Sequence, residues 1–474
     1  MMVKHPNQNP GSGFILVAIL VIVMLGSMVA MSLLFRLQAE EHASSAGADS
    51  EQAWLAAMSG VEEAFRMAAA AKPGGTEWRD NPHAFKDRFV CDSGSERWYF
   101  TVYSKGDEDS LDPLRYGITD EASRLNLNTA SKESLLRIPG VDQRLIDSLG
   151  GKEPIPTMTF ALGGLNDSNG WTLPRQMQSL GELLAFSGFN PQVLYGEDAN
   201  CNLRLDPNED DGNERPPADN HDGKLDLGLS AFLTVHSYDL NVDNKGIVRT
   251  DINDSKDPFP LVELPAALTN FITALRTNSL RVDHPADLLE AKMQVKDDKG
   301  AAVEIQSGVD KAQLTQVIDL FYGTSAKKSE GLVNVNTASI KVLAALPGMD
   351  DPLAEAIASG RRSTSPEHRT TIAWLFEEGV LDAEHFKKVA PYITARSFQF
   401  TFHVVGYSLP SRKFRALEVG IDVAGGKRSV TYLRDLTRLG LPLELQERSA
   451  EGSNQARAKE RPNRTLNDRK ITHG

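Results

Sequence analysis

The chain has one long, almost uninterrupted hydrophobic run near its N-terminus. From Phe14 to Phe35 the sequence reads FILVAILVIVMLGSMVAMSLLF, which contains no charged residue. At 1.5 Å of rise per residue, a helix of this length spans roughly 33 Å, enough to cross the hydrocarbon core of a bilayer. A helical pattern continues without a breaker to Pro73-Gly74-Gly75. The pattern therefore predicts a transmembrane helix over residues 14–35 that continues as one helix to about residue 72.

Alternation of apolar and polar residues, the pattern of half-buried strands, occurs in four segments: Trp98–Tyr103, Ser397–Tyr407, Arg415–Val423 and Ser429–Leu436. Residues 425–427, Gly-Gly-Lys, predict a turn between the last two. One strand before a long stretch and three strands after it predict a single antiparallel sheet. We expect this sheet to be formed by residues 76–118 and 391–440, with residues 119–390 inserted between them.

The predicted insertion contains an internal duplication. Residues 124–142 read RLNLNTASKESLLRIPGVD, and residues 332–350 read LVNVNTASIKVLAALPGMD. In each copy an extended N-x-N-T-A segment enters a helix, and a Pro-Gly turn opens a second helix. Polar side chains are expected to cap the first helix of each copy: Thr129 or Ser131, and Thr337 or Ser339.

Further helical patterns lie between the two copies, including ADLLEAKMQV and DKAQLTQVIDLFYG. The insertion is therefore predicted to be mostly α-helical. The whole chain is predicted to be an α+β protein, with a long N-terminal helix, an antiparallel sheet and this large inserted domain. Residues 441–474 are polar and charged without apolar periodicity, which predicts a disordered tail.

Charge adds one feature to this picture. The 474 residues contain 51 Lys plus Arg and 64 Asp plus Glu, which gives a formal net charge of −13. So acidic a chain lacks the basic surface expected of a nucleic-acid-binding protein. More than half of the excess lies in residues 197–226, which contain ten acids and three bases. Such a density of negative charge repels itself unless a cation lies inside it.

The spacing of oxygen-bearing residues in this acidic loop is that of an EF-hand-like calcium site. Positions 1, 3, 5, 7, 9 and 12 are filled by Asp198, Asn200, Asn202, the carbonyl of Arg204, Asp206 and Glu209. Leu203 occupies position 6, where the sharp turn usually has Gly. All-oxygen ligands favour Ca²⁺ over zinc or copper. We therefore expect one Ca²⁺ here, and a solvated turn region is the alternative.

A second, incomplete loop follows. Asn220, Asp222 and Asp226 fall at positions 3, 5 and 9, but position 1 is Ala218. A neighbouring acid would have to complete the ligand set: Asp210, Asp211 or Asp219. This half-loop would hold a second Ca²⁺, or would be a solvated turn.

The N-terminal leader ends at a distinctive junction. The polar segment MMVKHPNQNPGSG, residues 1–13, places Gly13 directly before Phe14 and the apolar run. This junction resembles the processing site of type IV prepilins and pseudopilins. The resemblance implies cleavage after Gly13 by a prepilin peptidase and methylation of Phe14. The fifth mature residue is usually Glu in that family, whereas it is Ala18 here; a plain signal-anchor is the alternative.

The absence of that Glu resembles one branch of the family, the large K-type minor pseudopilins of type II secretion systems. The duplicated segments resemble helix-hairpin-helix motifs, which K-type pseudopilins carry in two copies within an insertion, together with bound calcium. This resemblance covers the chain to about residue 440. It implies a structural subunit anchored in the inner membrane by one span, with its bulk in the periplasm. Such a subunit caps the pseudopilus tip in a complex with other minor pseudopilins and supports protein export.

Two other functional classes fit the residues less well. A membrane-tethered DNA-binding protein of a competence system would also use helix-hairpin-helix motifs, but Asp142 and Asp350 stand where such motifs usually have a second Gly before a basic residue. No nucleic-acid partner is therefore expected. No HExxH, GxSxG or phosphate-binding Gly-rich motif is present, so the chain is not expected to be an enzyme. Whether Cys91 and Cys201 form a disulfide stays open.

Overall fold

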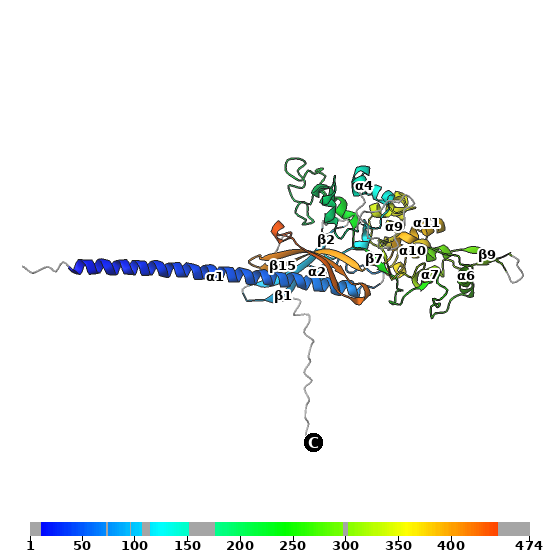
Figure 1. Ribbon diagram of the computed structural model, residues 1–474, viewed down its shortest axis with the longest axis horizontal. Helices are drawn as coiled ribbons and strands as arrows, with labels where there is room; N and C mark the ends of the chain where they lie inside the picture. Colours follow the sequence, from blue (N-terminus) through cyan, green and yellow to red (C-terminus); the bar gives the residue numbers. More distant parts are fainter. Residues whose placement is uncertain are drawn as a thin grey trace, which may run out of the picture.

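A computed structural model describes residues 11–72, 74–94, 96–106, 114–150, 176–296 and 302–443. Leader residues 1–10 and most of the predicted tail, residues 444–474, lie outside these ranges. Helix α1 (Gly11–Ala70) is 60 residues long and projects from the folded body as a straight rod (Figure 1). Its side chains from Ile15 to Leu37 are almost all exposed. Among the described residues, α1 is the one helix long and apolar enough to span a membrane.

The C-terminal part of α1 packs on an antiparallel sheet. The sheet has the order β1 (Arg88–Asp92), β2 (Arg97–Lys105), β15 (Gln399–Leu409), β16 (Phe414–Asp422), β17 (Ser429–Asp435). Two short strands add to it, since β3 (Leu114–Arg115) pairs with β2 and β4 (Thr119–Asp120) pairs with β15. The four predicted strands are confirmed, whereas β1, β3 and β4 were not predicted. The predicted turn is also confirmed, because Gly425 and Gly426 both adopt positive φ.

The two faces of this sheet are covered by different parts of the chain. Phe402, Val404 and Val419 point toward α1, and the alternate residues Val405 and Tyr407 point to the other face. The helix lies very close to the strands. A Cβ at Gly406 would lie 2.2 Å from the carbonyl O of Ala53 and 2.3 Å from the N of Ala57, both in α1. Glycine at this position is therefore a requirement of the helix–sheet contact.

Residues 121–398 lie between β4 and β15, two neighbouring strands of the sheet, and most of their buried side chains form a separate apolar cluster. Its helices are short: α3 (Lys132–Leu136), α4 (Gln143–Leu149), α5 (Pro191–Tyr195), α6 (Ala266–Thr277), α7 (Leu314–Leu320), α8 (Ile340–Ala344), α9 (Asp351–Ser363), α10 (Trp374–Glu377) and α11 (Ala383–Val389). A further short helix, α2 (Pro82–Phe85), precedes the sheet.

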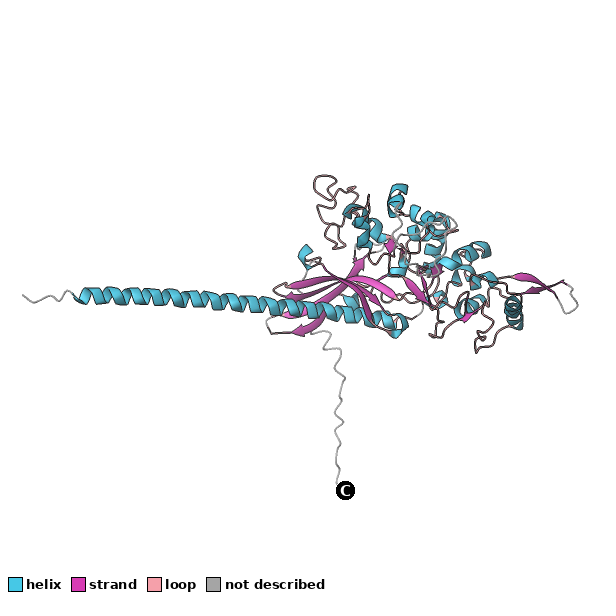
Figure 2. Ribbon diagram, in the orientation of Figure 1, coloured by secondary structure: helices cyan, strands magenta, loops and turns pink. Residues whose placement is uncertain are grey.

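Small two-stranded sheets alternate with these helices (Figure 2). The pairs are β5 (Leu125–Asn126) with β6 (Leu233–Thr234), β7 (Tyr238–Leu240) with β12 (Lys328–Glu330), β8 (Thr250–Asp251) with β11 (Phe321–Tyr322), β9 (Lys292–Lys296) with β10 (Ala302–Gln306), and β13 (Val333–Asn334) with β14 (Ile393–Thr394). The described part of the insertion therefore contains the predicted short helices together with strand pairs that were not predicted. Residues 286–295 were predicted as a helix, but they form a 3₁₀ turn that ends before Glu290, whose φ is +52°, and then enter the β9–β10 hairpin.

Each duplicated segment forms a strand followed by two helices joined by a Pro-Gly turn. The first helices are capped by Ser131 and Ser339, which accept hydrogen bonds from the backbone N of Ser134 and Val342. The second helices are capped by the two acids, since Asp142 accepts from the N of Leu145 and Asp350 from the N of Leu353, both at 2.9 Å. The main-chain donors at the start of α4 and α9 are therefore partly occupied by carboxylates of the chain itself.

The two copies exchange strands with each other. Strand β4, which precedes the first copy, pairs with β15, which follows the second. Strand β12, which precedes the second copy, pairs with β7, which follows the first. The duplication also extends to Thr234–Ser237 (TVHS) and Thr394–Ser397 (TARS), where each Thr hydroxyl accepts the N–H two residues later. The copies are thus interlocked by exchanged strands.

Two adjacent buried acids join the sheet to both copies. Oδ2 of Asp120, the last residue of β4, accepts hydrogen bonds from Asn334 Nδ2 at 2.9 Å, Thr337 Oγ1 at 2.6 Å and Ser397 Oγ at 2.7 Å. Burial raises the pKa of Asp120 to about 6, even though these donors favour its ionised form.

The next residue, Glu121, turns the other way. It accepts the hydroxyl groups of Thr234, in the first copy, and of Thr401, in β15. We call Asp120 and Glu121 the junction acids.

We expect Asp120→Ala to lower the free energy of unfolding by about 2–4 kcal/mol, because Asn334, Thr337 and Ser397 would lose a buried acceptor. Urea unfolding of the full chain in detergent measures this. Asp254→Ala, at an exposed acid, is the matched control. The double variant Asp120→Ala/Thr337→Val should be destabilised by less than the sum of the single variants. Additive effects would mean that the two side chains do not act together.

Candidate functional site

The acidic loop, residues 197–226, connects α5 to the 3₁₀ turn Gly228–Ala231. Its two ends meet, because the N of Glu197 donates to the carbonyl O of Asp226 at 2.8 Å. It lies above the sheet in Figure 1. Cys201 and Leu203 pack on the sheet face opposite α1, and Lys105 of β2 donates to the carbonyl of Leu225. The loop is therefore held at its ends and against the sheet.

The residues predicted for the first site come together around one turn. Oδ1 and Oδ2 of Asp198 accept the N–H groups of Asn202 and Leu203 at 2.9 and 3.0 Å. Oδ1 of Asn200 accepts the N–H of Asn202 at 3.1 Å, and Oδ1 of Asn202 accepts the N–H of Arg204 at 2.7 Å. Each side chain thus bonds to backbone further along the loop.

The last two ligands of the predicted set close this turn. Oε1 of Glu209 accepts from the N of Ala199 at 3.0 Å, and Oε2 accepts from the N of Asp206 at 3.1 Å. Oδ2 of Asp206 accepts from the side-chain amides of Asn200 and Asn202 at 2.7 and 2.8 Å. The five predicted side chains therefore share one hydrogen-bonded loop. Their oxygen donor set fits a hard divalent cation such as Ca²⁺.

The departure noted at position 6 is visible in the backbone. Leu203 adopts φ of +63°, the left-handed conformation that glycine usually supplies at this turn. The loop therefore keeps the turn that the site needs, at a cost in backbone strain. The Leu203 side chain is used instead for packing against the sheet.

Two carboxylates of this loop are buried, and no neighbouring positive charge among the described residues compensates for the cost of removing them from water. Asp198 is 3% exposed and Glu209 is 1% exposed. Burial, together with the negative charge of Asp206, raises the pKa of Asp198 to about 6 and that of Glu209 to about 7. A divalent cation at this point would supply the missing positive charge.

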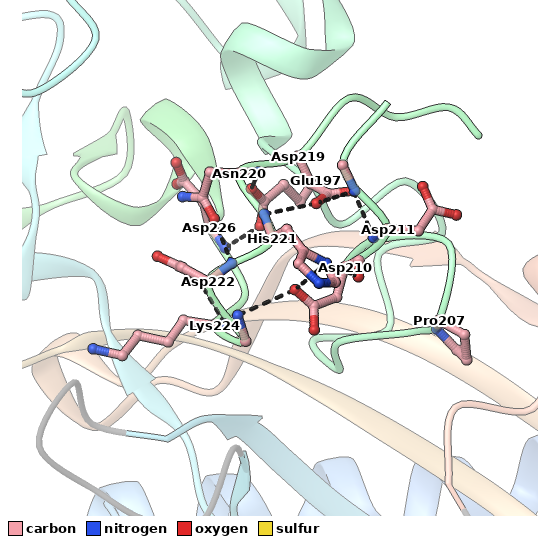
Figure 3. A network of polar contacts seen from close by, with 12 residues as sticks. Glu197, Pro207, Asp210, Asp211, Asp219, Asn220, His221, Asp222, Lys224 and Asp226 are labelled. Atoms are coloured by element: carbon pink, nitrogen blue, oxygen red, sulfur yellow. Dashed lines mark hydrogen bonds and ion pairs between the residues drawn. The ribbon is translucent and has the colours of Figure 1, made fainter. Parts of the chain in front are cut away.

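The second loop is completed by two acids from earlier in the chain (Figure 3). Oδ1 of Asp210 accepts the N–H of Gly223 at 3.1 Å. This bond corresponds to the one in which Asp198 accepts the N–H of Leu203 in the first loop. Glu197 accepts the N–H groups of Asn220 and Asp226 at 3.3 and 3.1 Å, close to the role of Glu209. Of the three acids considered for position 1, Asp210 is the one that accepts the N–H of Gly223.

The remaining predicted residues keep the pattern of the first loop. Oδ1 of Asn220 accepts from the N of Asp222, and Oδ1 of Asp222 accepts from the N of Lys224, at 3.0 and 2.9 Å. Asp211 pairs with Arg215 at 2.7 Å. Asp219 accepts three backbone N–H groups, those of Asp211, Gly212 and His221.

One cluster in this second loop has a metal-like spacing. Asp210, Asp219 and His221 each offer a ligand atom, and these atoms lie within 4.8 Å of one another. The cluster is more exposed than the first loop, since His221 lies on the surface. Glu197 and His221 were not predicted as ligands. Glu197 lies 29 residues before Asp226, so linear spacing carries no signal for it.

The other sequence-based candidates lie elsewhere. Gly13 and Phe14, the predicted processing junction, lie within the first turns of α1. Cys91, in β1, and Cys201, in the first loop, are both free cysteines. Cys201 Sγ accepts instead from Arg434 Nη2 at 3.2 Å.

No model of a known protein family matches the chain, and no curated protein sequence matches it closely enough to indicate a relative.

The raised pKa values of Asp198 and Glu209 predict how stability depends on pH without metal. Both acids bind protons more tightly in the folded than in the unfolded chain, so folding is favoured by acid. In EGTA, the free energy of unfolding should fall as the pH rises from about 4.5 to about 7 and should stay low above that. Glu209→Gln should flatten this profile and raise stability at pH 7.5 by about 1–2 kcal/mol.

Urea unfolding of the full chain between pH 5 and pH 7.5 measures this dependence. Glu214→Gln, at an exposed acid of the same loop, should leave the profile unchanged. A wild-type profile that rises with pH over this window would contradict the assignment of buried acids.

Proposed function

We propose that this chain is a K-type minor pseudopilin of a type II secretion system. In this proposal α1 anchors it in the inner membrane, and the rest lies in the periplasm, caps the tip of the pseudopilus and supports protein export. The observation that carries the proposal is the form of α1. Its exposed apolar half leads directly into a half that packs on a sheet, so that one rod connects a membrane segment to a folded head.

The position of residues 121–398 supports a capping role. In Figure 1 most of these residues lie beyond the C-terminal end of α1, along the direction in which the rod points. In a filament built from parallel N-terminal helices, the next subunit would have to add at this end. A folded body of this size at that position would block the addition by steric overlap. A subunit with this shape therefore suits the end of a filament.

The sequence of the proposed membrane segment is consistent with a place at the end of a filament. A carboxylate inside a bilayer is costly and persists only with a partner. In pilins the fifth mature residue is such a carboxylate, and its partner is the terminal amine of a neighbouring subunit. Ala18 replaces it here, so this subunit requires no such partner. The remaining exposed surface of α1 is available for packing against the helices of other minor pseudopilins.

We further propose that the acidic loop binds Ca²⁺, one ion in the first site and a second in the loop completed by Asp210 and Glu197. The support is the shared pattern of side-chain to backbone hydrogen bonds in the two loops, together with the burial of Asp198 and Glu209. Bound calcium would neutralise the local charge and hold the loop on the sheet.

DNA binding is not proposed. The main-chain donors that a phosphate would need at the second helix of each hairpin donate to Asp142 and Asp350 instead, and a carboxylate there repels phosphate.

We expect a prepilin peptidase to cut between Gly13 and Phe14. The mature protein extracted from membranes should therefore begin at Phe14, methylated on its amine, as measured by mass spectrometry of the N-terminal peptide. Gly13→Leu should block the cut, because the added side chain must enter a site shaped for glycine. Gly26→Leu, in open space within the same helix, should be processed normally. An intact Met1, or a cut near residues 35–50, would contradict the proposal.

Export provides the test of function in the source organism. Deletion of the gene should retain type II substrates in the periplasm. The wild-type gene should restore export, whereas Gly13→Leu should not. Normal export in the deletion strain would rule out the proposed role.

We expect Ca²⁺ to stabilise the full chain in detergent. A site with a dissociation constant of about 10 μM would add about 2.7 kcal/mol at 1 mM free Ca²⁺, which raises the melting temperature by several degrees. Asp198→Ala should remove most of this gain, and Glu214→Gln should keep it. Thermal unfolding in Ca²⁺, Mg²⁺ or EGTA measures the effect. An equal response to Mg²⁺ would indicate charge screening rather than a specific site.

A further inference from the structure

The first acidic loop has two chemically different sides. The oxygen-bearing residues Asp198, Asn200 and Asn202 alternate with Cys201 and Leu203, which are apolar. The oxygen-bearing side chains bond within the loop, as described above. Cys201 and Leu203 point the other way, onto the sheet face opposite α1. The same backbone therefore serves the proposed metal site and a packing surface.

That packing surface also holds the end of the described chain. Leu203 belongs to an apolar cluster built on Tyr103, Tyr407 and Leu436 of the sheet region. Leu441 and Leu443 pack against the same cluster. The segment Thr437–Leu443, which we call the C-terminal segment, begins two residues after the end of β17 and packs against the same cluster as the loop. The loop and the C-terminal segment thus share one apolar contact area.

Polar contacts connect the same two parts. Arg204 Nη1 donates to the carbonyl O of Pro442 at 3.4 Å. Arg434, in β17, donates to Cys201 Sγ and forms an ion pair with Glu418 of β16 at 3.2 Å. The loop is therefore bound to the C-terminal segment and to the two last strands of the sheet.

A hollow of about 110 Å³ separates the two parts where they do not touch. Its lining includes Asn200, Asn202 and Asp206, all residues of the predicted calcium site. Leu439, Gly440, Leu441 and Pro442 of the C-terminal segment line the same hollow. Side chains expected to move on metal binding therefore share this hollow with the C-terminal segment.

The hydrogen bonds within the loop indicate which side chains a cation would reorient. Asn200 and Asn202 direct their side-chain NH₂ groups at Asp206, whereas a cation requires oxygen atoms at the centre. Binding would replace these two bonds and draw the three side chains toward the ion. Without an ion, Asp198, Asp206 and Glu209 repel one another, which favours opening of the loop and loss of the packing made by Leu203.

We propose that the first acidic loop is a calcium-dependent clasp that fixes the C-terminal segment to the sheet. This inference rests on the calcium binding proposed above and adds its consequence. Occupancy of the first site by Ca²⁺ determines whether the C-terminal segment is held in a fixed position on the sheet. Its effect is local to the face of the sheet opposite α1, so the membrane helix is not involved.

Hydrogen exchange of the full chain in detergent, measured by mass spectrometry, tests the clasp. The probe is 1 mM Ca²⁺, compared with EGTA and with Mg²⁺. Ca²⁺ should slow exchange several-fold in peptides covering residues 198–209 and, in the same samples, in peptides covering the C-terminal segment. Calorimetric titration with Ca²⁺ reports binding independently of either segment.

The variant Leu203→Gly separates the two roles of the loop. It keeps every oxygen ligand and suits the positive φ at position 6, so Ca²⁺ should still protect residues 198–209. It removes the packing side chain, so protection of the C-terminal segment should be lost. Leu261→Gly, at a fully exposed leucine outside the loop, is the matched control and should behave as wild type.

The outcomes distinguish the two proposals. Protection of the loop without any change in the C-terminal segment of the wild type would overturn the clasp and leave calcium binding intact. Equal protection of the segment in wild type and Leu203→Gly would also overturn it. If titration shows no binding and neither segment responds, the calcium proposal fails, and the clasp fails with it.

Discussion

The contact between the junction acids and their hydroxyl and amide partners is the interaction on which the arrangement of the whole body depends. Asp120 ends a strand of the sheet and binds the second copy of the duplication, and Glu121 binds the first copy and β15. Both side chains are buried, so their partners cannot be replaced by water without cost. Two neighbouring residues thus orient the inserted segment relative to the sheet, and the sheet in turn carries α1. The direction of the rod relative to the bulk of the protein follows from this small polar centre.

The sheet positions a different part of the chain on each of its faces. On one face, Gly406 allows α1 to approach so closely that the helix backbone contacts the strand. On the other, Tyr103 and Tyr407 receive the acidic loop. Alternate residues of the same strands serve the two contacts, so a shift of register by one residue would exchange a helix-binding face for a loop-binding face. Helix α1 and the acidic loop therefore pack on opposite faces of the same sheet.

The main features of the fold could be predicted from the sequence because they rest on local periodicity. The apolar run of α1 and the alternation in β2, β15, β16 and β17 are visible in single segments, and the duplication preserved its Pro-Gly turns. Strands of two residues, such as β4 and β12, carry no periodic signal, and tertiary pairing alone creates them. The first acidic loop was predictable since its ligands are contiguous. The roles of Glu197 and Asp210 could not be predicted, because both residues precede the second loop in the sequence and only the folded chain brings them to it.

The exchanged strands have a consequence for the order in which the protein can fold. Strand β2 and the junction acids are synthesised early, but β15, which pairs with both β2 and β4, follows nearly 280 residues later. Neither copy of the duplication can form all of its strand pairs alone. Strand β7 pairs with β12, and β4 pairs with β15, so each needs a strand that is synthesised much later. Contacts so distant along the chain form slowly. A chain of this kind would present unpaired strands until almost all of it has been made, and a truncation anywhere before β15 would leave β2 and β4 without that partner.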